Sequence, residues 1–326
     1  MSDPVLRVIQ ERFQVDVNHR GLKRRPEANL CNAFPDDFEA TCASIVGHPS
    51  PSLAIVTGFL IPTAEPPAGE TDGPLGAVYL ARALIPLGVR VAILSDDFCM
   101  PALTAGLDEC GLSEHCDLHT LPTYADAKLW TGGRWTAWLR DRIPLCSHLV
   151  AIERVGPSHR PDTVDESHRD EFLNEVAAAD QDRCHTMRGR DITETMSPVA
   201  PLFEAALASS DLITIGIGDG GNEIGMGRLP WRLIRDDIQR GAAIACRIAT
   251  HRLLVAGISN WAAYGLAAGI AHLRKRSLPA ETCDPAVERR ILERMVEAGL
   301  VDGVSNQSIA SVDGLDFDRY ALGLPR

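Results

Sequence analysis

The chain has 326 residues, of which 45% are hydrophobic and 23% charged, and its formal net charge at pH 7 is −12. This acidic balance argues against a general binder of nucleic-acid phosphates, and an aromatic content of 5% disfavours a surface on which bases would stack. No run approaches the roughly 18 consecutive apolar residues of a membrane span. We therefore expect a small-molecule partner rather than nucleic acid or a membrane, and an anionic ligand would need a locally positive pocket.

The N-terminus and the cysteines both bear on location. Residues 1–20 lack an apolar signal core and carry Asp3, Glu11 and Asp16, unlike a secretory leader or an acid-poor transit peptide. The nine cysteines are scattered singly without a CxxC pair, so neither a zinc knuckle nor a dithiol motif is indicated. These features predict reduced, structural thiols and a cytoplasmic location.

Two parts are expected along the chain: a helical N-terminal segment over residues 1–46, packed on the core, and an α/β domain over residues 47–326. The apolar residues at helical spacing in the first part are Val5, Leu6, Ile9 and Phe13. In the second part, apolar runs rich in β-branched residues alternate with helical patterns. Strands are expected at 52–57, 90–95, 119–121, 147–152, 212–217 and 252–258, helices at 75–84, 100–109, 261–274 and 285–298, and an exposed polar loop at 157–170. This alternation predicts an α/β fold with a mostly parallel sheet and helices on both faces.

Several of the predicted strands end in polar or glycine-rich residues. In open α/β sheets, ligands bind beyond the carboxyl ends of the strands. The strand-end residues are Thr57 and Gly58, Glu153 and Arg154, Asp219 and Gly220, and Ser259 and Asn260. We expect these groups to meet in one crevice; the alternative is that each strand simply runs into an ordinary polar loop.

The segment GIGDGGNEIGMG, residues 216–227, has six glycines in twelve positions. Its GxGxxG spacing is typical of a dinucleotide site, but no regular helix follows and no acid ends a second strand, so no nucleotide is expected. Bare backbone of this kind favours a nest whose N–H groups bind an anionic oxygen. The alternative is a tight structural turn. The candidate residues in this segment are Gly218, Asp219, Gly220, Gly221, Asn222 and Glu223.

Further candidates lie in other loops. Asp72, in ETDGPLGA, is placed either to cap the helix that follows or to contact a ligand. Glu70 is not placed to cap that helix, so capping does not account for its presence. Three arginines are the natural counterweights to an acidic ligand, since a guanidinium suits a carboxylate. These are Arg154, Arg188 and Arg190. Trp261 is expected in the core, and the Asp-Gly pairs of VDGV (301–304) and VDGL (312–315) indicate turns.

The segments TGF, ETDGPLGA, AIER, MRGRDI, IGIGDGGNEIGMG, SNWAAYGL and VDGV together resemble the D-glutamate cyclase C-terminal domain family. The resemblance runs from about residue 50 to about residue 316. It implies similarity to the stand-alone microbial members, without the additional hydro-lyase-like domain of the longer vertebrate proteins. It also implies a lyase that converts D-glutamate to 5-oxo-D-proline with loss of water. A homo-oligomer is compatible with this assignment.

The residues can be matched to that chemistry in two ways. In the first, Asp219 or Glu223 binds the substrate ammonium and takes its proton, while Asn222 and the amides of residues 218–221 stabilise the oxyanion. Arg188 then binds the α-carboxylate. In the second, a divalent cation, Mg²⁺ or Mn²⁺, on Asp219 and Glu223 activates the substrate. The other substrate-binding candidates are Thr57, Gly58, Glu70, Asp72, Glu153, Ser259 and Asn260.

Two other classes of function remain open. One is a metal-dependent hydrolase or lyase that acts on another small carboxylic acid, which the same acids and nest would serve. The other is a non-catalytic sensor of an acidic metabolite. An enzyme is favoured over a sensor, because a sensor has little use for clustered carboxylates beside an anionic ligand.

Overall fold

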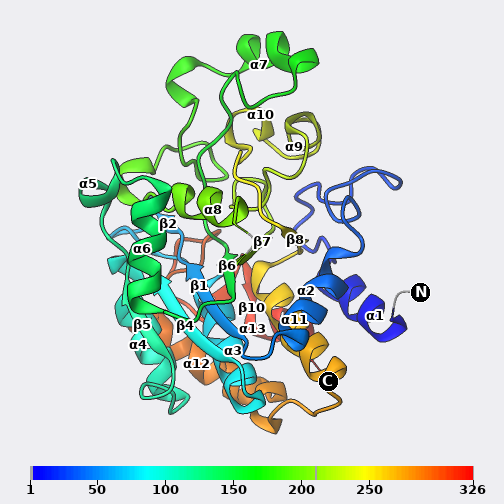
Figure 1. The fold of residues 1–326 in the computed structure, drawn as a ribbon, viewed down its shortest axis with the longest axis vertical. Coiled ribbons are helices and arrows are strands. Elements are labelled where there is room, and N and C mark those ends of the chain that lie inside the picture. Colours follow the sequence, from blue (N-terminus) through cyan, green and yellow to red (C-terminus); the bar gives the residue numbers. More distant parts are fainter. Residues whose placement is uncertain (1–2, 210, 326) are drawn as a thin grey trace.

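A computed structural model describes residues 3–209 and 211–325. Its centre is a six-stranded, all-parallel sheet with the order β5-β4-β1-β6-β7-β8 (Figure 1). The strands are β1 (Ser52–Thr57), β4 (Arg90–Ser95), β5 (Asp117–Thr120), β6 (His148–Ile152), β7 (Ile213–Gly218) and β8 (Arg252–Val255). The predicted α/β fold with helices on both faces is confirmed.

Alternate side chains of each strand enter two separate hydrophobic clusters, one on each face of the sheet. Leu53 and Ile55 of β1 belong to one cluster, and Ala54 and Val56 belong to the other. The first face is covered by α1 (Pro4–Phe13), α2 (Asp37–Gly47), α3 (Pro74–Leu84), α4 (Met100–Glu109), α11 (Ser259–Leu273) and α12 (Pro285–Glu297). The second is covered by α6 (Gly132–Arg142), α8 (Ala200–Leu207), α9 (Trp231–Asp237) and α10 (Gly241–Ile244). Because both faces are buried, the strands show continuous apolar runs rather than alternation.

Short elements complete the chain. They are the antiparallel pairs β2 (Leu60–Ile61) with β3 (Ala68–Gly69) and β9 (Ser311–Val312) with β10 (Leu315–Asp316), and the helices α5 (Tyr124–Ala127), α7 (Arg169–Glu175) and α13 (Phe317–Tyr320). In Figure 1, α7 lies in a part that projects from one end of the molecule. Among the described residues, none of the helices has the length and apolar character needed to cross a membrane. All nine cysteines are free of disulfides, as expected.

Some sequence-based boundaries were wrong. The last strand ends at Val255, not at residue 258, and α6 and α8 were not predicted. Helix α6 begins at Gly132 and Gly133 and buries only Trp135 and Leu139, so its apolar pattern is too sparse to detect. The polar stretch 157–170 is mostly irregular, as predicted, but α7 begins at Arg169.

The N-terminal part has two helices that pack on α11, and residues 14–36 between them form neither helix nor strand. Leu6 and Phe13 of α1 are buried, but Val5, expected on the same face, is 44% exposed. The division at residue 46 stays a prediction. The end of α1 and the start of residues 14–36 lie beside the chain that follows β8: the Gly257 N–H donates to the Phe13 carbonyl oxygen at 2.8 Å, and Val15 lies against Gly257.

The strand order places a topological switch point between β1 and β6. The chain moves from β1 outward through β4 to β5, and then returns to the other side of β1 as β6. The loops after these two strands diverge in opposite directions, which opens a crevice at the carboxyl edge of the sheet. Strand ends at Thr57, Ile152 and Gly218 all meet that edge.

We expect Gly257→Ala to lower the free energy of unfolding by about 2 kcal/mol or more, the scale of overpacking in a filled interior. A Cβ at this position would lie 1.7 Å from the Val15 carbonyl oxygen, so residues 13–16 would have to move. Gly47→Ala is the matched control, because its Cβ meets nothing within 4 Å. Chemical denaturation measures both. Equal stability of the two variants would contradict close packing of this segment.

Candidate active site

A cavity of about 310 Å³ opens at the carboxyl edge of the sheet, a size suited to a small ligand. Glu153 follows β6 and Asp219 follows β7, and both face the cavity. Loops outside the sheet supply the other polar groups that line it. These are Arg20, Thr63, Glu70, Thr186, Arg188, Arg190, Gln239 and Asp313. The predicted convergence of strand ends therefore holds for Glu153 and Asp219.

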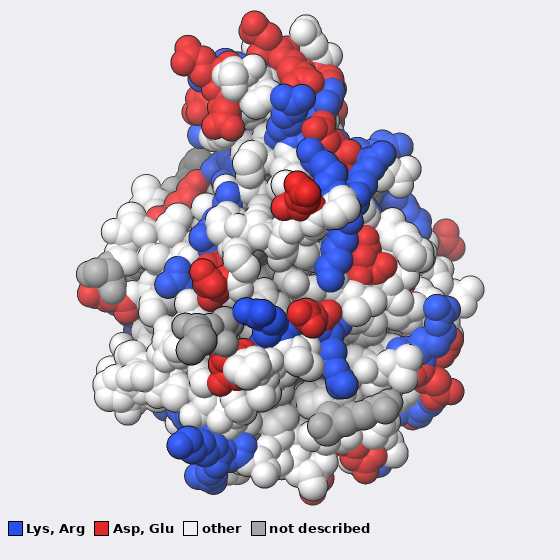
Figure 2. All heavy atoms as spheres, turned by 90° about the vertical axis from the view of Figure 1, so that its right-hand side faces the viewer, with Lys and Arg blue, Asp and Glu red and all other residues white. Residues whose placement is uncertain are grey.

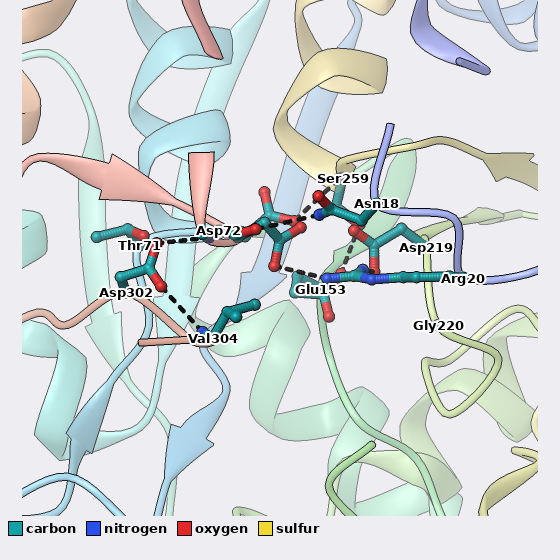
Figure 3. A network of polar contacts seen from close by, with 12 residues as sticks. Asn18, Arg20, Thr71, Asp72, Glu153, Asp219, Gly220, Ser259, Asp302 and Val304 are labelled. Atoms are coloured by element: carbon teal, nitrogen blue, oxygen red, sulfur yellow. Dashed lines mark hydrogen bonds and ion pairs between the residues drawn. The ribbon is translucent and has the colours of Figure 1, made fainter. Parts of the chain in front are cut away.

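Arg20 is the basic group inside this site, and the sequence analysis did not identify it. Its guanidinium forms an ion pair with Asp219 (Figure 3) and a second one with Asp313, at 2.7 Å between Nη2 and Oδ1. The Asp16 carboxylate holds the loop by accepting the N–H groups of Arg20, Gly21 and Leu22 at 2.9–3.1 Å. Only 16% of the Arg20 side chain is exposed. Burial acts to lower the pKa of Arg20, but the nearby carboxylates, Asp219 first, together outweigh burial and hold this pKa well above its usual value.

Three carboxyl groups beside Arg20 form what we call the carboxylate cluster: Asp72, Glu153 and Asp219. One oxygen of each lies within 4.8 Å of the other two, and all three residues are buried. Burial, followed by repulsion from neighbouring acids, raises the pKa of Asp72 to about 8 and the pKa of Glu153 well above its usual value. Burial also raises the pKa of Asp219, which Arg20 opposes. The cluster therefore has a strong affinity for positive charge.

Asp72, which was expected either to cap its own helix, α3, or to contact a ligand, takes part in an exchange of caps between α3 and α11. Its carboxylate accepts the N–H groups of Ser259 and Asn260, both at 2.9 Å, at the start of α11. The Asn260 Oδ1 in turn accepts the N–H groups of Gly73 and Gly76, both at 2.8 Å, at the start of α3. The exchange fixes the position of the Asp72 carboxylate between two helix N-termini, where negative charge is favoured.

Glu153 has an unusual backbone conformation and a defined side chain. Its φ of 45° lies in the left-handed region, which costs a non-glycine residue about 1–3 kcal/mol and is typical of functional sites. The Ser259 hydroxyl donates to Glu153 Oε2 at 2.6 Å. The Glu153 side chain lines the cavity.

The glycine run forms a nest, but the protein itself fills it. The Glu223 carboxylate accepts the N–H groups of Asp219, Gly220 and Gly221 at 3.1, 2.6 and 2.8 Å. The expectation that these amides await a substrate oxygen is therefore wrong for this arrangement. Dense glycine is needed because a Cβ at Gly218 or Gly220 would lie 2.9 Å from the Glu223 side chain.

Other predicted site residues lie outside the cavity wall. The Asn222 side chain is fully buried and donates to the His185 carbonyl oxygen at 2.8 Å. Thr57 is buried, and the Gly58 carbonyl oxygen accepts from the Arg154 guanidinium at 3.2 Å. Arg154 also pairs with Asp96 in the interior, so it is structural and does not face a ligand.

Two of the three predicted arginines lie at the mouth of the cavity. Arg188 and Arg190 are exposed there, and the Arg188 Nη2 donates to the Val304 carbonyl oxygen at 2.8 Å. A loop organised by Asp302 supplies this carbonyl: the Asp302 carboxylate accepts the N–H groups of Val304, Ser305 and Gly314 at 2.7–3.0 Å. The guanidinium groups of Arg188 and Arg190 thus lie at the entrance of the cavity, and the buried carboxyl groups lie deeper inside it.

The second Asp-Gly pair has a role beyond the predicted turn. Asp313 and Gly314, with φ of 56° and 76°, join β9 to β10 in a tight hairpin, the turn type that Asp-Gly favours. The turn also directs the Asp313 carboxylate to Arg20. Trp261 lies in the core, as expected, where its indole N–H donates to the Tyr320 carbonyl oxygen at 3.0 Å.

The free energy of unfolding of the ligand-free protein should fall between about pH 7 and about pH 8. Around the site, five buried carboxyls have a raised pKa: Glu70, Asp72, Glu153, Asp219 and Glu223. The native state therefore keeps protons that the unfolded chain has released, and rising pH removes this stabilisation. The loss is up to about 1.4 kcal/mol per pH unit for each proton kept.

Chemical denaturation at the two pH values measures this change. Glu70→Gln removes one titrating carboxyl and should give a smaller change. A free energy of unfolding that is constant or that rises with pH would contradict the electrostatic picture of the site.

Two comparisons with known proteins agree with the sequence resemblance. The chain is 28% identical, over 339 aligned residues, to "D-glutamate cyclase, mitochondrial" of Homo sapiens. That alignment covers 96% of this chain and 49% of the human protein, so the chain spans about half the length of this curated relative. A family model described as "D-glutamate cyclase-like, C-terminal" matches residues 10–170 and 172–324. Because this match takes in every strand of the sheet and the loop that carries Arg20, the chain belongs to the D-glutamate cyclase-like, C-terminal family.

Proposed function

We propose that the chain is a lyase that cyclises D-glutamate to 5-oxo-D-proline with loss of water. The observation that carries the proposal is the arrangement of charge in the cavity. Arg188 and Arg190 stand at its entrance, and Glu70, Glu153 and Asp219 line its interior beside Arg20. Family membership and the printed name of the human relative support the choice of reaction.

The reaction needs groups of both signs. The α-nitrogen forms a bond to the γ-carbon, one C–O bond of the γ-carboxylate breaks, and the two protons lost by the ammonium leave with that oxygen as water. An ammonium must therefore be deprotonated, and a carboxylate must lose its negative charge before it becomes an electrophile. Carboxyl groups in the cavity can accept protons from nitrogen and return them to oxygen. A guanidinium offset from them can bind the substrate carboxylates.

The charge layout also suggests how a dicarboxylate is oriented. Arg188, at the mouth, suits the α-carboxylate, which does not react. The ammonium then points toward the buried carboxyl groups. An amino acid with the opposite configuration could not place both groups in the same way, so we propose a preference for the D enantiomer.

Purified protein incubated with D-glutamate should form 5-oxoproline, and L-glutamate should give much less. The product is followed by chromatography, with and without added Mg²⁺ or Mn²⁺. Absence of product from D-glutamate under every condition would refute the proposal. Turnover of another small acid would instead favour a hydrolase or a different lyase, and ligand-induced stabilisation without turnover would favour a sensor.

Asp219→Asn should lower turnover by about 10²-fold or more, the usual scale for a positioned acid–base group. The change keeps the shape of the side chain and removes its charge. Stability should change little, because the loss of the ion pair with Arg20 is offset by weaker repulsion within the carboxylate cluster. The control is Asp318→Asn, whose side chain is 87% exposed. Near-normal turnover of Asp219→Asn would assign this residue to the turn alone.

Arg188→Ala should raise KM for D-glutamate by about ten-fold or more, the scale of a hydrogen bond between charged groups, with a smaller change in kcat. The control is Arg290→Ala, an exposed arginine on α12. Steady-state kinetics of the two variants measure the difference. Unchanged KM for Arg188→Ala would remove this residue from the substrate site.

A further inference from the structure

The Arg20 guanidinium lies inside the cavity and has N–H donors to spare. On the face that Figure 2 shows, acidic and basic side chains are intermixed over the surface, whereas only 16% of the Arg20 side chain is exposed and it lines the cavity. Among the described residues, the ion pairs with Asp219 and Asp313 are the polar contacts of this side chain. A guanidinium has five N–H donors, so some remain for a ligand in the cavity.

The loop around Arg20 holds the guanidinium in one place. The Asp16 carboxylate accepts three consecutive N–H groups of this loop, and Leu22 is fully buried. Gly21, with φ of 103°, packs so closely that a Cβ there would lie 2.0 Å from the Asp237 carbonyl oxygen. Donors stabilise a transition state best when their surroundings orient them before the ligand arrives. The position of Arg20 meets this requirement.

We infer that Arg20 binds the γ-carboxylate of the substrate, the group that reacts, and stabilises the negative charge on its oxygens as the ring closes. The identity of the substrate rests on the proposed function. Ring closure needs the α-nitrogen within about 3–3.5 Å of the carbon of the γ-carboxylate. The protein groups that receive the ammonium and the γ-carboxylate must therefore be neighbours.

Arg20 and Asp219 are such neighbours. They form an ion pair inside the cavity, so an ammonium beside Asp219 and a carboxylate beside Arg20 would lie next to each other. Arg188 is exposed at the mouth, where it donates to the Val304 carbonyl oxygen, and it suits the α-carboxylate, which takes no part in bond formation. Each substrate carboxylate then has its own arginine, and the planar fork of donors on each arginine matches a carboxylate.

The buried carboxyl groups beside Arg20 do not keep a carboxylate out. Burial first, and then repulsion between the acids, raises the pKa of Asp72 to about 8, and burial also raises that of Glu153 and of Asp219. A carboxyl group that holds its proton has no negative charge and can donate that proton in a hydrogen bond. Such groups therefore repel an entering carboxylate less than ionised ones would.

Arg20 keeps its own proton during the reaction, because its pKa lies well above the usual value. The α-nitrogen bonds to the carbon of the γ-carboxylate, one C–O bond breaks, and the two protons lost by the ammonium leave with that oxygen as water. Glu153 and Asp219 line the cavity and can carry these protons. Glu223, expected beside Asp219 in this role, does not line the cavity, and both of its oxygens accept N–H groups of the nest.

The test compares two ligands that cannot cyclise because they lack the amine: glutarate, with two carboxylates, and glutaramate, in which an amide replaces one of them. Calorimetry with the full chain at pH 7 measures both Kd values. The wild-type chain should bind glutarate tighter by about ten-fold or more, the scale of a hydrogen bond between charged groups. Arg20→Gln should reduce this preference to less than about three-fold. Arg24→Gln, which removes an exposed arginine of the same segment outside the cavity wall, is the matched control and should keep the preference.

Turnover of D-glutamate gives a second measurement. Arg20→Gln should lower kcat by about 10²-fold or more, the scale of one lost oxyanion donor, whereas Arg188→Ala acts mainly on KM. An unchanged kcat would overturn the catalytic part of the inference.

Three binding results would overturn the inference as a whole: no preference for glutarate in the wild-type chain, the full preference in Arg20→Gln, or an equal loss in Arg24→Gln, which would show only a diffuse positive field. Circular dichroism establishes that the variants are folded. If Arg20→Gln does not fold, Arg20→Lys replaces it; this change keeps the charge but loses the planar fork, and it should reduce the preference by about three-fold or more. An Arg20-dependent preference for glutarate without any 5-oxoproline from D-glutamate would refute the proposed reaction and leave the carboxylate subsite standing.

Discussion

The burial of several carboxylates around one guanidinium is the constraint on which the rest of this site depends. Water solvates each of these charges favourably, whereas burial of a charge in the interior has a high free-energy cost unless a partner of opposite charge or a hydrogen-bond donor is near. Arg20 pairs with Asp219 and Asp313, and backbone N–H groups satisfy Asp72 and Glu223. These partners leave part of the negative charge unbalanced. The site can therefore take up protons or a cationic ligand, and both its pH dependence and its chemistry follow from this.

The scaffold supplies rigidity where that charge is held. The strand order opens a crevice beside β1 and β6, and the exchange of caps between Asp72 and Asn260 ties α3 to α11 directly beneath it. A movement of either helix would break the hydrogen bonds that cap the N-terminus of the other helix. The exchange therefore keeps the Asp72 carboxylate close to those of Glu153 and Asp219, which maintains the raised pKa of Asp72.

The sequence predicted the parts of this site that follow from periodicity and failed where distant segments meet. Apolar β-branched runs located the strands, and parallel topology brought Glu153 and Asp219 together, as expected. Arg20 could not be found in this way, because its loop has no periodic pattern and contacts Asp219 and Asp313 far along the chain. Local rules left Asp72 either as the cap of α3 or as a ligand contact, and they could not show that its carboxylate accepts the amides of α11 in the folded protein. The hydrogen bonds from the nest to the Glu223 carboxylate could have been predicted, because Glu223 is only two to four residues away from the amides that donate them.

The N-terminal segment thus contributes Arg20 to the lining of the cavity, where it pairs with Asp219. Gly257 lacks a side chain, which allows Val15 to pass close to the end of β8, and Asp16 then folds the loop so that Arg20 enters the site. The family match begins at residue 10 and so includes this loop. Without Arg20, Asp219 and Asp313 would lose the cation that both contact. More bound protons, or a ligand with more positive charge, would then be needed to neutralise the carboxylates of the cavity. The loop therefore sets the charge that the cavity presents to whatever it binds.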